Sequence, residues 1–143
     1  MSASEARGEA GQVTAFVVVF VVALVFLAGL VIDGGYVLAA RRRAMNEAQA
    51  AARAGAQALD LDTYRRGGTY TLDPDGARSA ALSYLDRTGH GDGAAVDVAG
   101  DTVSVSVSFD QPLNILGIAG APTVSVSGAG SARSARGVVS EGP

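Results

Sequence analysis

The chain has 143 residues, no cysteine and a net charge of −3, with 11 basic residues, all arginine, and 14 acids. The absence of cysteine excludes disulfides, thiolate nucleophiles and zinc–thiolate sites, and the acidic balance argues against general nucleic-acid binding. From Asp60 onward ten acids accompany six arginines, whereas four arginines cluster earlier, between Arg41 and Arg53. Charge is therefore unevenly distributed along the chain.

The first element in chain order is an apolar run, "VTAFVVVFVVALVFLAGLVI" at residues 13–32, preceded by a short N-terminal tail at residues 1–12. The run is uncharged and only Thr14 is polar. A helix of this length spans about 30 Å, the hydrocarbon thickness of a bilayer, so we predict a single transmembrane helix. The alternative is a cleaved secretory signal, but the apolar region is too long for one, and Glu5 and Glu9 outnumber Arg7 at its start.

Residues 33–61 continue the helical periodicity and are predicted to form an amphipathic, alanine-rich stalk helix. The face opposite its polar residues carries small side chains, which allow another helix or a sheet to approach closely. The alternative is that alanine is present only because it favours helix. The predicted helix-packing seam consists of Ala44, Ala48, Ala51, Gly55 and Ala58.

The transition between the apolar run and the stalk contains an acid, two glycines and three arginines. We predict that Asp33 marks the membrane interface, where a carboxylate reaches water, and that Arg41, Arg42 and Arg43 form a solvated collar that binds lipid headgroups. The alternative is that this acid and the collar pair with other subunits of an assembly. Residues 34 and 35, both glycine, cost about 1 kcal/mol each within a helix, which predicts a kink or a melted turn.

Residues 62–136 are predicted to form a small α+β domain, followed by a frayed tail at residues 137–143. In "DPDGARSAALSYLDRTG", Asp73 can cap a second short helix, Pro74 suits its first turn, and Gly89 can end it. Apolar residues then recur at every second position in "AAVDVAGDTVSVSVSFD" and in "PTVSVSGAGSAR". This alternation predicts a three-stranded antiparallel β meander. The intervening "QPLNILGIAG" is predicted to be a hydrophobic loop or a short turn of helix.

Catalytic and metal-binding constellations are absent from this pattern. His90 and Asp92 in "TGHGDG" fall short of a closed metal site, and the serines have no evident base to activate them. The stretch "YRRGG" at residues 64–68 is predicted to be a solvated loop. We therefore expect no enzyme, no catalytic, cofactor or metal site, no small-molecule substrate and no nucleic-acid partner.

Three stretches together resemble the TadE/TadG-like proteins of tight adherence (Flp) pilus assembly, in their actinobacterial form. They are "RGEAGQVTAF", "LAGLVIDGGYVLAARRRAMNEAQAAARAGAQAL" and "PLNILGIAGAPTVSVSGAGSAR". The resemblance implies a single-pass, pilin-like protein of the plasma membrane that contacts lipid and other pilus or secretion-platform proteins, either as a single subunit or as a homo-oligomer.

The resemblance also implies an extracytoplasmic C-terminal domain, whereas the excess of arginines after the apolar run would leave that domain in the cytoplasm. We follow the resemblance, because an acidic domain rich in Ser and Thr is typical of an exported module.

Pilin-type precursors carry a glycine cleavage site followed by a glutamate at the fifth mature position. Cleavage after Gly11 would place Phe16 there, and cleavage after Gly8 would place Val13 there. Processing is therefore not expected, and an accessory role is favoured over a bulk filament subunit; the alternative function is a membrane-anchored binding or adhesion module outside a pilus.

Overall fold

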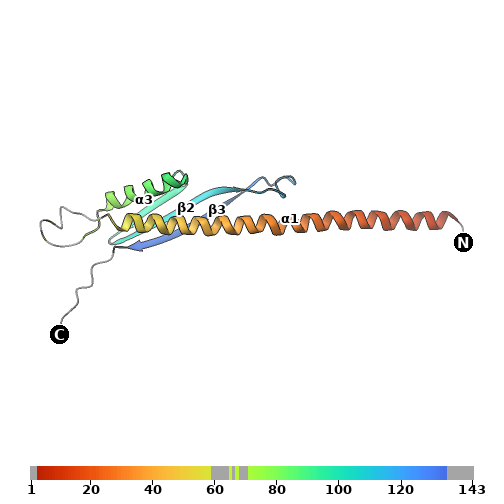
Figure 1. Ribbon diagram of the computed structural model, residues 1–143, viewed down its shortest axis with the longest axis horizontal. Helices are drawn as coiled ribbons and strands as arrows, with labels where there is room; N and C mark the ends of the chain where they lie inside the picture. The colour runs from red at the N-terminus through yellow and green to blue at the C-terminus, as the bar shows by residue number, and fades with distance from the viewer. Residues whose placement is uncertain (1–2, 59–64, 66, 68–70, 135–143) are drawn as a thin grey trace, which may run out of the picture. The chain divides into compact units, whose positions relative to one another are not determined.

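The computed structural model describes residues 3–58, 65, 67 and 71–134. Its main elements are a long helix α1 (Ala3–Ala56), a short helix α3 (Pro74–Thr88) and the strands β1 (Ala94–Ala99), β2 (Thr102–Pro112) and β3 (Thr123–Arg133) (Figure 1). A long apolar N-terminal helix, a second short helix and a three-stranded antiparallel sheet confirm the predicted α+β class. The predictions for residues 59–61 of the stalk and for the tail at 137–143 lie outside the described residues.

Helix α1 is unbroken across Gly34 and Gly35, so the melted turn predicted there does not occur. Two glycines cost about 2 kcal/mol together, but interrupting the helix would require a second, unfavourable nucleation event immediately afterwards. The helix ends at Ala56, and the N–H of Ala58 then donates to the carbonyl of Gly55 at 3.0 Å. The last seam residue, Ala58, therefore lies just beyond the helix.

Helix α3 has the ends that its sequence predicts. The Asp73 side chain accepts a hydrogen bond from the Asp75 N–H at 3.1 Å, and Pro74 occupies the first turn. Gly89 ends the helix in the left-handed conformation with φ of 81°, which glycine adopts without steric cost. These local signals fix the helix, and its apolar face of Ala77, Ala81 and Leu85 is fully buried.

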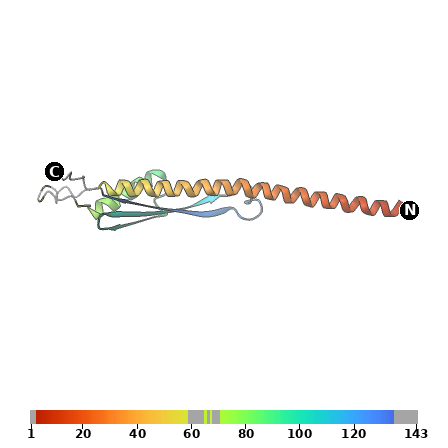
Figure 2. The same cartoon turned by 90° about the horizontal axis from the view of Figure 1, so that it is seen from below.

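The sheet has the order β1-β2-β3. Strands β1 and β2 form an antiparallel hairpin whose register runs from Ala94 opposite Val107 to Ala99 opposite Thr102. One face of β2 is buried and the other exposed, as the alternation of valine and serine predicts. Helices α1 and α3 cover the buried face with a core composed of Ala48, Ala51, Ala52, Ala56, Leu72, Ala77, Ala81, Leu85, Val103, Val105 and Val107. Figure 2 shows the strands running beside the C-terminal part of α1.

The chain divides into two compact units. The first consists of residues 1–37 and 112–124, and the second of residues 38–111 and 125–143. The first unit therefore combines the apolar part of α1 with the loop that joins β2 to β3. The second unit contains the rest of α1, helix α3 and most of the sheet.

Candidate functional site

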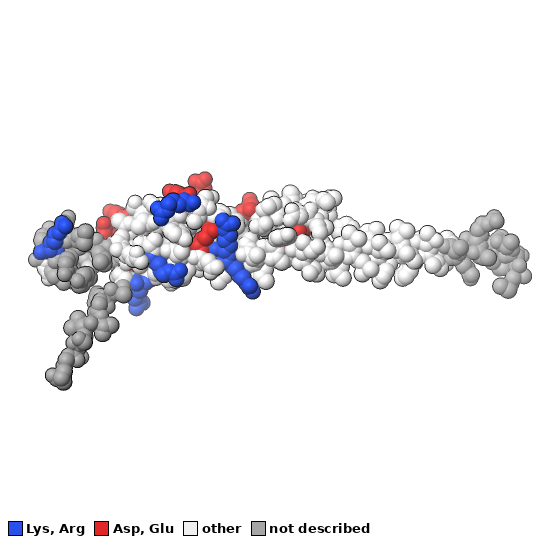
Figure 3. Space-filling view, viewed as in Figure 1, with Lys and Arg blue, Asp and Glu red and all other residues white. Residues whose placement is uncertain are grey.

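The large side chains in the apolar run of α1 are not covered by protein. Its large side chains from Val13 to Ile32 are each 48–70% exposed, and Figure 3 shows an uncharged stretch along this part of the helix. Among the described residues, one helix is long and apolar enough to cross a bilayer. Soluble monomers rarely expose a continuous apolar surface of this kind, so the exposure fits a single-pass membrane anchor.

Asp33 follows the apolar run directly, and its side chain is 1% exposed. Its carboxylate accepts three backbone hydrogen bonds from the loop between β2 and β3. Oδ1 accepts from the Asn114 N–H at 3.0 Å, and Oδ2 accepts from the N–H groups of Ile115 and Leu116 at 3.0 and 2.7 Å. Successive backbone N–H groups of this kind form a concave anion site. The structure thus places the carboxylate against this loop rather than in water.

The loop at residues 113–122 is uncharged, and most of its backbone N–H groups donate hydrogen bonds. Besides the three N–H groups that bond Asp33, five more donate to carbonyls inside the loop, including Leu113 to Pro122 at 2.9 Å and Ala119 to Leu116 at 3.0 Å. The side chain of Ile115 lies against Gly29, one helical turn before Asp33, so closely that a Cβ on this glycine would overlap it. The loop is therefore docked on α1 by one charged and one apolar contact.

The predicted helix-packing seam lies inside the second unit. Ala44, Ala48 and Ala51 are fully buried, Gly55 is buried, and Ala58 is half-buried. A Cβ on Gly55 would lie 2.8 Å from the Ala77 carbonyl oxygen of α3. The structure thus fills this face with the chain's own α3 and sheet.

Strand β3 approaches α1 through two glycines, Gly128 and Gly130. A Cβ on Gly128 would overlap the backbone of Ala44 and Met45. A Cβ on Gly130 would lie 2.5 Å from the Gln49 backbone nitrogen. The Gln49 side chain adds a hydrogen bond from Nε2 to the Ser131 carbonyl at 2.8 Å. Small residues on both elements therefore bring a strand into backbone contact with the helix, as small residues do between close helices.

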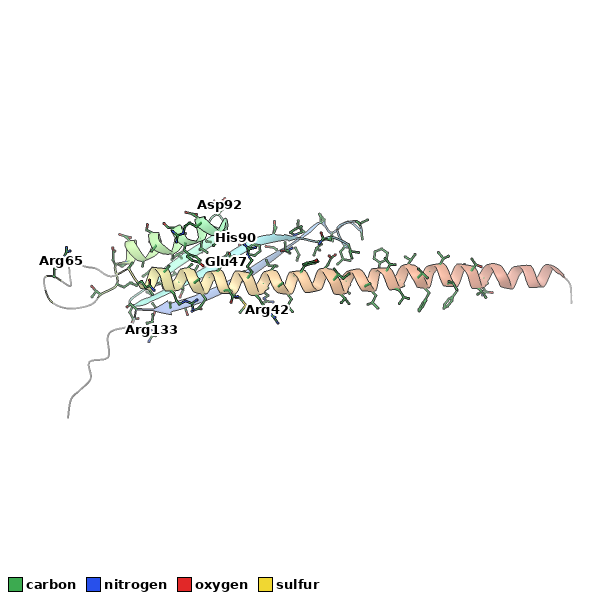
Figure 4. All side chains as sticks on the ribbon, viewed as in Figure 1. Arg42, Glu47, Arg65, His90, Asp92 and Arg133 are labelled. Carbon is green, nitrogen blue, oxygen red and sulfur yellow. The ribbon has the colours of Figure 1, made fainter. Side chains whose placement is uncertain are left out.

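The three arginines of the predicted collar are exposed, and Figure 4 shows Arg42 directed away from the helix. Arg43 also pairs with Glu47, with Nε 2.8 Å from Oε1. The collar therefore presents its charge outward from α1. Its assignment to lipid headgroups or to other subunits stays a prediction.

His90 and Glu47 form a contact that the sequence analysis did not identify. His90 Nδ1 lies 2.7 Å from Glu47 Oε2, and the imidazole stacks on the Phe109 ring with centroids 4.2 Å apart (Figure 4). Glu47 is only 9% exposed, so its carboxylate is held by Arg43 on one side and His90 on the other. The histidine, which the sequence places in a loop, therefore links α1 to the end of α3 and to β2.

The described residues were also compared with the requirements of a metal site. Within them, no cluster of three or more histidines and acids could hold a metal ion. Of the stretch at residues 64–68, only Arg65 and Gly67 are described. The candidate site considered for function is the exposed anchor with the loop docked at its end.

The family comparison matches this same part of the chain. A family model described as putative Flp pilus-assembly TadE/G-like matches residues 11–58. Residues 11–58 are thus similar to a TadE/G-like segment. The match confirms the predicted resemblance and supports a role in Flp (tight adherence) pilus assembly, a family that is structural rather than enzymatic and whose members are expected to contact other pilus proteins. No curated protein and no solved structure matches the chain.

The TadE/G-like segment contains the anchor, Asp33, the arginines and the small-residue face, but not the groups that complete them. The partners of Asp33 lie 81 to 83 residues later. A sequence signal for this contact did exist: an uncharged apolar loop between two strands, and an acid at the membrane boundary without a nearby basic partner. No comparable signal pointed to the contact between Glu47 and His90.

Proposed function

We propose that the protein is a membrane-anchored, pilin-like accessory component of a tight adherence (Flp) pilus or of a related secretion apparatus. The observation that carries this proposal is that the family match ends at residue 58, two residues after α1 ends. The matched segment thus consists of the anchor and of the helix on which the small domain is built. A pilin-like protein needs these two parts, an apolar helix for lateral contacts and a small domain attached to it.

The partner surface in this proposal is the exposed side of the apolar run. The small-residue face from Ala44 to Gly55 packs against the chain's own sheet and α3, so it is occupied by the protein itself. The side chains between Val13 and Ala28 remain uncovered. Partner helices of the assembly platform would pack on them through van der Waals contact, the main force between helices in lipid.

The small domain is extracytoplasmic in this proposal. Its acidic balance from Asp60 onward supports export, and the arginines after the apolar run are the opposing argument. A tag placed after Pro143 should be digested when protease is added to cells stripped of their wall. Digestion only after permeabilisation would contradict the proposed orientation.

The accessory role, rather than that of a bulk filament subunit, is supported by the lack of an acid at the fifth position after either candidate glycine. Most of the protein in cells should therefore retain Arg7 and Gly8, ahead of both candidate cleavage sites, together with Glu9 and Ala10. Mass spectrometry of the N-terminal peptide tests this directly. A mature form that begins at Glu9 or at Gln12 as the main species would contradict the accessory role.

A scrambled anchor tests the assembly function. Residues 13–28 are permuted among themselves, so that composition and hydrophobicity are kept while Gly29, Asp33 and the small domain stay unchanged. An assembly component should lose pilus formation or secretion while its abundance in the membrane stays normal. Normal assembly with the scrambled anchor would reject specific lateral contacts.

The second candidate is a membrane-anchored binding or adhesion module. It is favoured by an open depression on the sheet, lined by Ala95, Asp97, Ser104, Ser106 and Ser131 among others. This module should tolerate the scrambled anchor and lose function when Ser104 and Ser106 are replaced by bulky residues. The two candidates therefore predict opposite responses to the same pair of variants.

A further inference from the structure

The loop at residues 113–122 contacts a part of α1 that lies inside the predicted transmembrane segment. Ile115 rests on Gly29, which precedes the end of the apolar run at Ile32 by three residues. Three residues of helix correspond to about 4.5 Å along the axis. If residues 13–32 fill the hydrocarbon core, the Ile115 side chain therefore reaches below the membrane surface.

The composition of the loop fits that depth. Residues 112–122, "PLNILGIAGAP", contain no charge, and Asn114 is their single polar side chain. The side chain of Ile118 is 90% exposed, although isoleucine is among the residues most often buried. The loop is thus uncharged and exposes an apolar side chain beside the end of the predicted membrane helix. These are the properties expected of a surface that faces lipid.

Irregular backbone enters lipid only when its polar groups have partners. In this loop five N–H groups donate to carbonyls of the loop itself, and three donate to the buried carboxylate of Asp33. The carboxylate is at the same time a charge at the membrane boundary, and these three donors neutralise part of the cost of burying it. The contact therefore supplies partners to three loop N–H groups and to the acid together.

We propose that residues 113–122 form a second membrane-embedded element, inserted at the boundary between headgroups and acyl chains beside the C-terminal end of the transmembrane helix. Asp33 is the positioning residue that holds this loop at that depth, and the side chain of Ile118 enters the lipid. The exposed face of the loop thus contacts the bilayer and not another protein. The proposal rests on the membrane anchor and is independent of the pilus role.

The test uses single cysteines, because the natural chain has none. The full chain is reconstituted into vesicles of phosphatidylethanolamine and phosphatidylglycerol with a nitroxide label at Ile118→Cys. Matched labels at Val25→Cys, in the exposed apolar run, and at Ser106→Cys, on the exposed side of β2, report lipid and water. Collision with oxygen, which partitions into lipid, is compared with collision with a water-soluble nickel chelate.

The label at Ile118 should collide more with oxygen than with the chelate, as the Val25 label does and opposite to the Ser106 label. Equal or greater collision with the chelate would overturn the proposal. Exclusion of both reagents would also overturn it, in favour of a protein partner or a second copy of the chain on the loop. A Val25 label that meets the chelate would contradict the membrane anchor itself, which separates that failure from failure of the loop.

The role of Asp33 is tested by adding Asp33→Asn separately to the Ile118-labelled chain and to the Ser106-labelled chain. The amide keeps the size of the side chain but replaces one acceptor oxygen with a donor that faces backbone N–H groups. The Ile118 signal should shift toward the chelate while the Ser106 signal stays unchanged. An unchanged lipid signal at Ile118 would overturn the positioning role of Asp33.

Discussion

Replacing Gly128 with alanine tests the seating of β3 on α1. The added Cβ would meet the Met45 Cα at 2.7 Å and would overlap the backbone of Ala44, where ordinary contacts are 3.4–4 Å. No side-chain rotation relieves this overlap, because every atom involved belongs to the helix backbone. The strand must therefore move away from the helix by roughly 1 Å, which would also loosen the contact at Gly130.

Overpacking of this kind costs about 1–3 kcal/mol, and the entropy that alanine removes from the unfolded chain returns about 0.4–1 kcal/mol. We expect a net loss of about 1–2 kcal/mol in the free energy of opening β3. Since each 1.4 kcal/mol is a factor of ten, this corresponds to about 5- to 30-fold faster hydrogen exchange of the β3 amides. The measurement is hydrogen exchange by mass spectrometry on the full chain in detergent micelles.

Two variants serve as controls for Gly128→Ala. Gly35→Ala makes the same chemical change where nothing lies within 4 Å of the new Cβ, and Ala129→Thr changes the neighbouring residue on the exposed side of β3. Both should change the free energy of opening β3 by no more than about 0.5 kcal/mol relative to the natural chain. If Gly128→Ala behaves like these controls, β3 is not in backbone contact with α1, and the reasoning about the small-residue face is refuted.

Three further substitutions probe the remaining contacts, again by hydrogen exchange on the full chain. Leu85→Ala should lower the free energy of unfolding by about 2–5 kcal/mol and accelerate exchange throughout α3 and β2, because it empties a fully buried core position. Faster exchange confined to α3 would contradict a core shared by the two elements. Asp73→Ala removes the N-cap of α3 and should cost about 0.5–2 kcal/mol, most visibly in the first turn; unchanged protection there would argue against the cap. Glu47→Gln weakens the links to Arg43 and His90 and should cost about 1 kcal/mol, with faster exchange near His90; no change in that segment would show that the contact does not hold the end of α3.

Local signals in the sequence predict much of this fold. The cap at Asp73, the left-handed Gly89 and the alternation of valine and serine each act within a few residues, so their outcome hardly depends on the rest of the chain. The small-residue face of the stalk is also visible in the sequence. Its periodicity shows that something approaches closely, but the sequence analysis left open whether a partner helix or the chain's own sheet does so.

Contacts between distant residues were not predictable in the same way. Asp33 meets Asn114 to Leu116 only after the sheet has returned the chain to the end of the anchor, and Glu47 meets His90 only after α3 has packed on α1. A local reading therefore placed Asp33 in water, and although it correctly placed His90 in a loop, it did not find the contact with Glu47. The unbroken helix at Gly34 and Gly35 illustrates the same limit, because local propensity was outweighed by the continuity of a 54-residue helix.

The central claim, that the protein is anchored in the membrane and works with pilus-assembly proteins through that anchor, is tested most directly by photo-crosslinking in native membranes. A photoreactive residue is placed at Val21, which is 51% exposed in the apolar run, and for comparison at Ser106 on the exposed side of β2. The account predicts that the Val21 probe yields adducts with membrane proteins of the pilus or secretion platform, identified by mass spectrometry. Adducts with lipid alone at Val21, together with specific protein or glycan adducts at Ser106, would contradict it and would favour the anchored binding module.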